Sequence, residues 1–274
     1  MFNIKSRLIN QLASSLILAI SLGFSSTSDA KLLNMGKGLI NDTDLNVTWL
    51  RDANSFFTLS GKGKNPAKAR GLVNAIIAAV PMIADDIEVH EVVSADFDPH
   101  NGKMSWWGAQ AWVGYLNSIN YKGFNDWRLP IVAPVDGIEL NCTTSYDGST
   151  DDGYNTSAVN TTAHELPHVY YQELHNLSNV TISGLGLSKG YGLKKKGPFI
   201  NVRKGIYWTG TLYPLYSFAG DMFHFDTRNG GMGHDQKFFQ SYAWVARTGL
   251  VPKQLRNRSA SAGNEPIPTG GRFE

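Results

Sequence analysis

The chain has 274 residues, with 25 Lys and Arg against 23 Asp and Glu and a formal net charge of +2. This balance predicts neither a nucleic-acid binder nor a strongly acidic surface, so any binding to polyanions needs a local basic patch. The only cysteine is Cys142, which excludes an internal disulfide and leaves stability to a hydrophobic core. Seven Trp, 13 Phe and 11 Tyr supply the apolar bulk for such a core.

The first residues have the pattern of an export signal. Lys5 and Arg7 precede an apolar run at 12–24, which is shorter than the roughly 20 residues that span a bilayer. Small residues up to Ala30 then give the spacing of a cleavage site. We therefore expect residues 1–30 to be a signal peptide cut after Ala30. The mature product is expected to be secreted, periplasmic or held at the cell surface, without stable membrane insertion.

The mature chain is predicted to form one domain over 31–251, followed by a polar, disordered tail at 252–274. In chain order its first half predicts a hairpin at 36–54, a helix at 66–80, an edge strand at 87–93, a helix at 104–119, an extended turn at 123–130 and a solvated polar loop at 141–162. The second half predicts a glycine- and lysine-rich loop at 181–197, a turn at 228–234 and strands at 205–211, 219–227 and 238–248.

Residues 164–168 read HELPH and fit the zinc-protease pattern H-E-x-x-H. In that pattern both histidines lie in one regular helix and face the same metal. Pro167 opposes this arrangement, because a proline inside a helix loses a backbone donor and clashes with the carbonyl four residues back. We expect a helix that starts at Pro167 and covers 167–176, with His164 in the preceding loop. The segment therefore predicts a helix start and no metal site.

Two acidic clusters resemble weak calcium sites. Asp42 and Asp44 begin a calcium-loop pattern, but Val47 takes the place of its glycine, and a turn capped by its own side chains is the better interpretation. Solvation in the polar loop is the better account of the second cluster, which consists of Asp147, Asp151 and Asp152. A weak calcium site stays an alternative at both places.

Four groups of aromatic, acidic and arginine residues follow one another along the chain. Their members are Asp44, Trp49 and Asp52; Trp112 with Asp126, Trp127, Arg128 and Pro130; Glu165, in a segment of the form E-L-x-H-x-x-Y-x-E-L; and Tyr207, Trp208, Trp244 and Arg247. This ordered set resembles the domain family named for the C-terminal domain of the collagen-like adhesin of Legionella, abbreviated Lcl. The resemblance covers roughly residues 36–250 and gives these residues a structural role.

The resemblance implies an α+β fold of the C-type-lectin-like and formylglycine-generating-enzyme group, with two main helices and a twisted antiparallel sheet. The adhesin domain binds sulfated glycosaminoglycans through basic surface residues and assembles as a trimer, so the same properties are implied here. The chain departs from the family in lacking a collagen-like stalk and in carrying extra sequence near 60–100. One cysteine cannot supply the cysteine pair on which the enzymatic relatives depend.

These observations predict an exported recognition domain, without catalytic residues or a cofactor, that binds a glycan or another polyanionic surface polymer. The candidate ligand-binding residues are basic and gather in a glycine-bearing stretch; they are Lys189, Lys194, Lys195, Lys196, Arg203 and Lys204. A solvated loop that keeps the protein soluble explains these lysines equally well.

Two other functions stay open. A secreted hydrolase would use Asp, Glu or His residues at 141–175. A structural matrix component would be joined to its partners through the tail or through Cys142, which is expected to be a free surface thiol.

Overall fold

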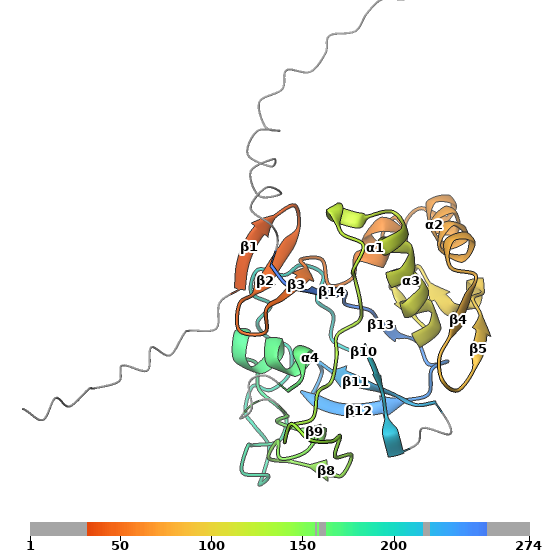
Figure 1. The fold of residues 1–274 in the computed structure, drawn as a ribbon. Helices are drawn as coiled ribbons and strands as arrows, with labels where there is room; N and C mark the ends of the chain where they lie inside the picture. Colours follow the sequence, from red (N-terminus) through yellow and green to blue (C-terminus); the bar gives the residue numbers. More distant parts are fainter. Residues whose placement is uncertain (1–31, 157, 159–162, 216–219, 251–274) are drawn as a thin grey trace, which may run out of the picture.

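A computed structural model describes residues 32–156, 158, 163–215 and 220–250, which form a mixed α+β fold (Figure 1). The predicted α+β class is confirmed, with few helices and several largely antiparallel sheets. The predicted export signal at 1–30 and the predicted tail at 252–274 lie outside the described residues. Within those residues, every helix is too short or too polar to cross a bilayer.

A small antiparallel sheet joins the first and last described strands. Its strands, in order across the sheet, are β1 (Leu32–Gly36), β2 (Leu39–Asp42), β3 (Val47–Leu50) and β14 (Ala246–Thr248). One row of paired residues crosses the whole sheet and consists of Leu32, Asp42, Val47 and Thr248. The hairpin predicted at 36–54 is therefore confirmed, and it is one half of a larger sheet.

Asp42 closes the turn between β2 and β3. Its Oδ1 atom accepts hydrogen bonds from the backbone N–H groups of Asp44, at 3.1 Å, and Leu45, at 3.2 Å. This is the capped turn that the sequence predicts in place of a calcium loop. Asp44 itself is exposed.

A second, larger sheet forms the centre of the molecule. Its strands, in order, are β6 (Phe97–Asp98), β7 (Lys103–Met104), β13 (Ser241–Tyr242), β10 (Ile206–Leu212), β11 (Met222–Asp226), β12 (Gly231–Asp235), β9 (Asp152–Tyr154) and β8 (Thr144–Ser145). Most pairs are antiparallel, but β13 runs parallel to β10 and β8 runs parallel to β9. The predicted strands at 205–211 and 219–227 correspond to β10 and β11.

Two predictions in the C-terminal third are wrong. The segment 228–234, predicted as a turn, contains most of β12, so the turn is shorter and β11 and β12 form a hairpin. The strand predicted at 238–248 is broken in two, because β13 joins the large sheet whereas β14 joins the small one. Between them, Trp244 and Val245 are buried in different apolar clusters. This segment therefore crosses from one sheet to the other.

Three helices lie together on one side of the sheets, at the right of Figure 1. They are α1 (Ser55–Leu59), α2 (Pro66–Ala79) and α3 (Trp106–Ser118), accompanied by a hairpin of β4 (Met82–Ala84) and β5 (Val89–Glu91) and by the 3₁₀ turns η1 (Ser94–Asp96) and η2 (Tyr121–Gly123). Both long helices have a side-chain cap, since Asn65 Oδ1 accepts from Lys68 N and Ser105 Oγ accepts from Gly108 N. The helices predicted at 66–80 and 104–119 are confirmed.

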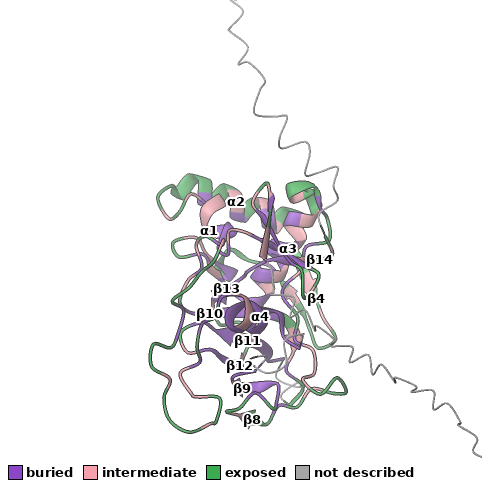
Figure 2. Ribbon diagram, turned by 90° about the vertical axis from the view of Figure 1, so that its left-hand side faces the viewer, coloured by how far each residue is buried: buried purple, intermediate pink, exposed green. Residues whose placement is uncertain are grey.

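The central strands, such as β3 and β11, are buried on both faces, so two apolar cores form. Leu50 and Trp208 belong to the core under α1–α3, whereas their neighbours Trp49 and Tyr207 belong to the opposite core. The alternation follows from the pleat of a strand, which directs successive side chains to opposite faces. Figure 2 shows the buried residues gathered along the strands, with exposed residues on α2 and the outer loops.

Replacement of Trp208 by alanine tests this arrangement. Its side chain is fully buried, and its Nε1 atom donates to the backbone oxygen of Met104 at 3.0 Å. We expect Trp208→Ala to lower the free energy of unfolding by about 3–5 kcal/mol, since it leaves a large cavity. Ile138→Ala, at a side chain that is 82% exposed, should change it by less than about 0.5 kcal/mol. Equal effects in urea unfolding would contradict the described core.

Candidate functional site

The HELPH segment begins a short helix in which an α-helical turn, α4 (Glu165–His168), continues as a π-helical turn, η3 (Val169–Glu173). His164 is the N-cap residue with extended backbone angles, outside the helix as predicted. The predicted start at Pro167 is wrong, because the helix begins at Glu165. Proline is tolerated in this first turn since the first four N–H groups of a helix have no intrahelical acceptor.

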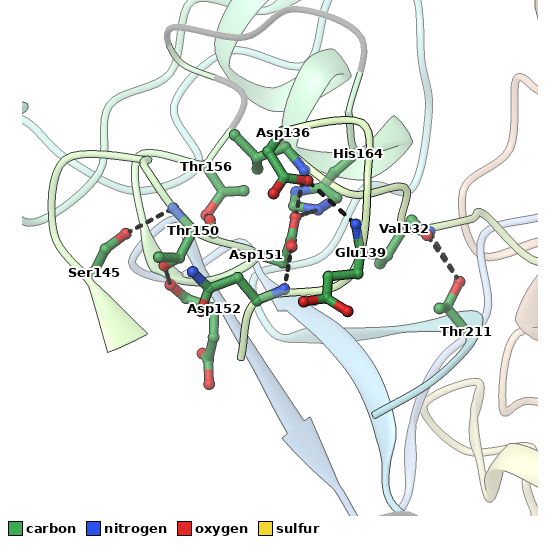
Figure 3. Close-up of polar contacts among 12 residues, drawn as sticks. Val132, Asp136, Glu139, Ser145, Thr150, Asp151, Asp152, Thr156, His164 and Thr211 are labelled. Carbon is green, nitrogen blue, oxygen red and sulfur yellow. Dashed lines mark hydrogen bonds and ion pairs between the residues drawn. The ribbon is translucent and has the colours of Figure 1, made fainter. Parts of the chain in front are cut away.

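His164 pairs with an aspartate of the preceding loop (Figure 3). Its Nε2 atom lies 2.9 Å from Asp151 Oδ1, and both side chains are buried. Asp151 also accepts hydrogen bonds from the backbone N–H of Val135, at 2.8 Å, and of Asn141, at 2.7 Å. Solvation was the expected state of Asp151, and that expectation is wrong. Instead, its carboxylate organises the loop around itself.

The other two acidic residues of this loop differ from each other. Asp152 is also buried, and its Oδ2 atom accepts a hydrogen bond from the Tyr213 hydroxyl at 2.8 Å. Burial, together with this carboxylate, raises the pKa of Tyr213. Asp147 is exposed as predicted and caps Ser149 N. Among the described residues these carboxylates do not form a cation-ligating group of three, and Asp151 is already satisfied by backbone donors.

Glu165 forms a bidentate ion pair with Arg128. Its carboxylate receives two hydrogen bonds from the Arg128 guanidinium, at 2.6 and 2.7 Å, and a third from the backbone N–H of Ile131, at 2.9 Å. The Glu165 side chain is 7% exposed and that of Arg128 27%. Such a bidentate pair has fixed geometry as well as charge attraction. The Arg128–Glu165 pair joins the start of α4 to the segment 126–131, which precedes the polar loop at 141–162.

The neighbours of Arg128 anchor the same segment. Asp126 binds Arg247, a residue of β14, through two hydrogen bonds, at 2.7 and 2.8 Å. The indole Nε1 of Trp127 donates to the backbone oxygen of Tyr121 at 2.9 Å. Contacts of all three residues thus hold the segment 126–128 in place.

Most other residues of the four sequence groups lie in the interior. Asp52 holds the start of α1, because its carboxylate accepts from Asn54 N and from the Thr58 hydroxyl. Those that are buried are Trp49, Trp112, Pro130, Tyr207, Trp208 and Trp244. Among the described residues, their contacts are with other parts of the fold.

His168 belongs to a different cluster from His164. Its Nε2 atom lies 3.5 Å from Asp42 Oδ2 and 3.6 Å from Glu173 Oε1. One ligating atom from each of these three residues lies within 4.8 Å of the other two, and all three side chains are buried. The two histidines of HELPH therefore face different carboxylates and do not share one ion. The sequence holds no signal for this cluster, since no known ligand spacing connects Asp42 with His168.

The predicted basic stretch lies at the surface. All of its lysines, Lys189, Lys194, Lys195, Lys196 and Lys204, are exposed, and none forms an ion pair with a described carboxylate. Arg203 differs because it is half-buried, with its guanidinium carbon 5.2 Å from the centre of the Phe57 ring. Arg203 is therefore a weaker ligand candidate than the lysines.

A buried asparagine fixes the backbone that carries the three consecutive lysines. Asn176 Oδ1 accepts hydrogen bonds from Lys194 N, at 2.9 Å, and Lys195 N, at 2.8 Å, and its Nδ2 atom donates to Lys195 O, at 2.9 Å. The flanking side chains of Leu193 and Phe199 are buried. The loop predicted at 181–197 is confirmed, but sequence reasoning missed this clamp, because an isolated asparagine has no distinguishing pattern.

A cavity of about 440 Å³ lies between α2, the loop before it and the segment after η1. Ala69, Val73 and Phe97 give it an apolar floor, and Arg70 and His100 are exposed at its edge. The volume is in the range of small-molecule sites, roughly 300–1,000 Å³. The cavity lies within the segment near 60–100, and sequence reasoning did not predict it.

Cys142 is buried, so the predicted surface thiol is wrong. The residue is 8% exposed, and its backbone oxygen accepts a hydrogen bond from the Tyr213 hydroxyl at 3.1 Å. Burial raises the pKa of the Cys142 thiol. Both effects lower the amount of accessible thiolate, which is the reactive form.

Comparisons with protein-family models, with curated proteins and with solved structures found no match. The resemblance to the Lcl family thus rests on the residues of the four sequence groups.

The two arginine pairs predict losses of stability that differ in size. Glu165→Gln should lower the free energy of unfolding by about 2–3 kcal/mol, since it breaks a largely buried pair and leaves Arg128 uncompensated. Asp126→Asn should cost less than about 1 kcal/mol, because the Asp126 side chain is 50% exposed. Urea unfolding of both variants at pH 7 would measure the difference. A larger cost for Asp126→Asn would contradict it.

The Asp126 pair also predicts a pH dependence. The hydrogen bond from Arg247 lowers the pKa of Asp126 in the folded state. The pair therefore stabilises the fold above the unfolded pKa, near 3.9, and this contribution is lost as the pH falls through the lower folded value. Below pH 4, Asp126→Asn should lose stability less steeply than the wild type in urea unfolding. Identical slopes would show that the pair is not formed.

Burial of Cys142 predicts slow reaction with a thiol reagent. At pH 8 the native chain should react with Ellman's reagent at least about tenfold more slowly than the same chain in 6 M urea, because only exposed thiolate reacts. Equal rates, or a native dimer that disappears with reductant, would restore the reading of Cys142 as a surface thiol that links the chain to partners.

Proposed function

We propose that this chain is an exported, non-catalytic recognition domain of the Lcl C-terminal type that binds polyanionic glycans or other surface polymers. The lysine stretch, defined as Lys189, Lys194, Lys195, Lys196 and Lys204, is its binding site. The observation that carries this proposal is the exposure of these five side chains without an ion pair to any described carboxylate. A C-type-lectin-like arrangement is part of the proposal, supported by the α+β class and the largely antiparallel sheets.

Local charge supports a polyanionic ligand. No Asp or Glu occurs in the sequence between Glu173 and Asp221, so the lysine stretch lies in a long segment without acidic residues. The near-neutral net charge of the whole chain therefore conceals a strongly basic segment. Such a segment attracts sulfate and carboxylate groups, and the attraction weakens as salt is added.

Order in the backbone supports binding over a purely solubilising role. A solubilising loop needs charge but no fixed conformation, whereas Lys194–Lys196 lie on a backbone clamped by Asn176 and anchored by Leu193 and Phe199. Preorganisation of this kind reduces the entropy lost on binding. Tyr191, which is 45% exposed, offers an aromatic face of the kind that packs against sugar rings.

The hydrolase alternative is less well supported. It would use titratable residues at 141–175, and of these Asp151 and His164 form the most complete pair. Their side chains are 1% and 0% exposed, and Asp151 is held by two backbone N–H groups. A substrate therefore has no direct access to either group.

Binding to heparin tests the lysine stretch. The variant with Lys194, Lys195 and Lys196 all changed to Ala should bind immobilised heparin about tenfold more weakly than the wild type, since three exposed charge contacts contribute roughly 0.2–1 kcal/mol each. The difference should shrink when the salt concentration rises from 0.05 to 0.3 M.

A matched control removes the same charge elsewhere. Lys62, Lys64 and Lys68 are exposed and lie near the cavity at α2, so their triple alanine variant should bind heparin as tightly as the wild type. Equal losses in both variants would mean general charge attraction. A loss in the control alone would place binding at the cavity side, and absence of wild-type binding would overturn the proposal as a whole.

A further inference from the structure

The cluster of Asp42, His168 and Glu173 is distinct from the proposed binding surface and is enclosed within the fold. Asp42 comes from the end of β2, His168 from the end of α4 and Glu173 from the end of η3. The exposed fractions of the three side chains are 0%, 0% and 2%. Residues far apart in the sequence thus meet at one buried point.

The π-helical turn is what brings two of these residues together. His168 and Glu173 are five positions apart, which in a regular α-helix would place them about 140° apart around the axis. The wider turn, closed by the hydrogen bond from Leu174 N to Val169 O at 2.9 Å, reduces this separation. π-turns inside helices occur often at functional sites.

Two carboxyl oxygens in this cluster lack a hydrogen-bond donor among the described residues. Asp42 Oδ2 and Glu173 Oε1 are fully buried and accept no hydrogen bond from the described residues. The neighbouring helix residues Leu166 and Val169 belong to an apolar core. Removing a carboxylate from water costs several kcal/mol unless a positive charge compensates it. A cation placed between these two oxygens would compensate both carboxylates.

A protonated His168 is one possible cation, but the distances disfavour it. An N–H···O bond to a carboxylate normally measures about 2.7–2.9 Å, whereas His168 Nε2 lies at 3.5 and 3.6 Å from the two oxygens. A single imidazolium would also leave one negative charge uncompensated. These separations are instead close to the spacing of about 3.3 Å between ligands bound 2.0–2.1 Å from a tetrahedral ion.

The geometry points to a buried site for a divalent transition metal, Zn²⁺ above all, with Asp42 Oδ2, His168 Nε2 and Glu173 Oε1 as three of its ligands. Two carboxylates balance the charge of the ion, and imidazole favours Zn²⁺ over Ca²⁺ or Mg²⁺. The ion would link the end of β2 to both ends of the η3 turn. Because the site is closed, metal has to enter as the chain folds.

Refolding with and without metal tests this site. The mature chain is unfolded in 6 M urea with EDTA, then refolded in buffer, in ZnCl₂ or in MnCl₂, and desalted. We expect about one Zn²⁺ per chain by elemental analysis, and a thermal midpoint higher than that of the metal-free chain by several degrees. Less than about 0.1 ion per chain in every sample would overturn the site.

Variants show where the metal is bound. Glu173→Gln should reduce Zn²⁺ affinity at least tenfold in competition with a chelator, because it removes one ligand charge. Asp151→Asn is the matched control, since it changes a buried carboxylate beside the other histidine, and it should keep the wild-type stoichiometry. Unchanged affinity in Glu173→Gln would contradict the assignment.

The wild type alone decides the matter if Glu173→Gln fails to fold. In the Zn²⁺-loaded chain, the nitrogen NMR shifts of the His168 ring should stay those of a neutral, metal-bound imidazole at pH 5. Shifts of an imidazolium under the same conditions would show that a proton, and not a metal, occupies the cluster, and would overturn the site.

Discussion

Trp244 connects parts of this protein that lie far apart in the sequence. Its ring centre lies 5.1 Å from that of Trp49 in the small sheet, 6.0 Å from that of Tyr207 in the large sheet and 4.7 Å from that of Phe199. Its Nε1 atom also donates to the backbone oxygen of Leu50. Because Phe199 anchors the chain that carries the lysines, the position of the proposed binding surface depends on the same ring that connects the two sheets.

Short sequence patterns correctly predicted the turns and helices that depend on interactions between residues close together in the chain. The capped turn at Asp42 and the helix that starts at Pro66 follow from residues within a few positions of each other, and both were correct. The continuous strand at 238–248 failed because aromatic content indicates a strand but not which sheet it joins. The prediction that Asp151 is exposed to solvent failed for a related reason. Its polar sequence neighbours indicate a solvated loop, but two backbone N–H groups and His164 bind its carboxylate in the interior.

For the candidate sites too, sequence patterns predicted local features but not contacts made by the folded chain. Clustered lysines are visible in any sequence, so the basic stretch was found. Its clamp by Asn176 was not, because the side chain reaches across the loop to a backbone about 18 residues away. Pro167 led to the correct prediction that the two histidines of HELPH are separated. The reason is different, because His164 is the extended N-cap residue of a helix that starts at Glu165 and not at the proline. The proximity of His168 and Glu173 depends on a π turn, and no residue pattern marks such a turn.

The row of paired residues across the small sheet determines where the chain enters and leaves the folded domain. Leu32 and Thr248 stand at opposite edges of four adjacent strands in the same row, which places them about 14 Å apart at the usual strand spacing. A tether fused before β1 and one fused after β14 would therefore leave the folded body at neighbouring points. Either attachment would leave the domain facing its surroundings in much the same orientation, and a short linker between these points would suffice to permute the chain.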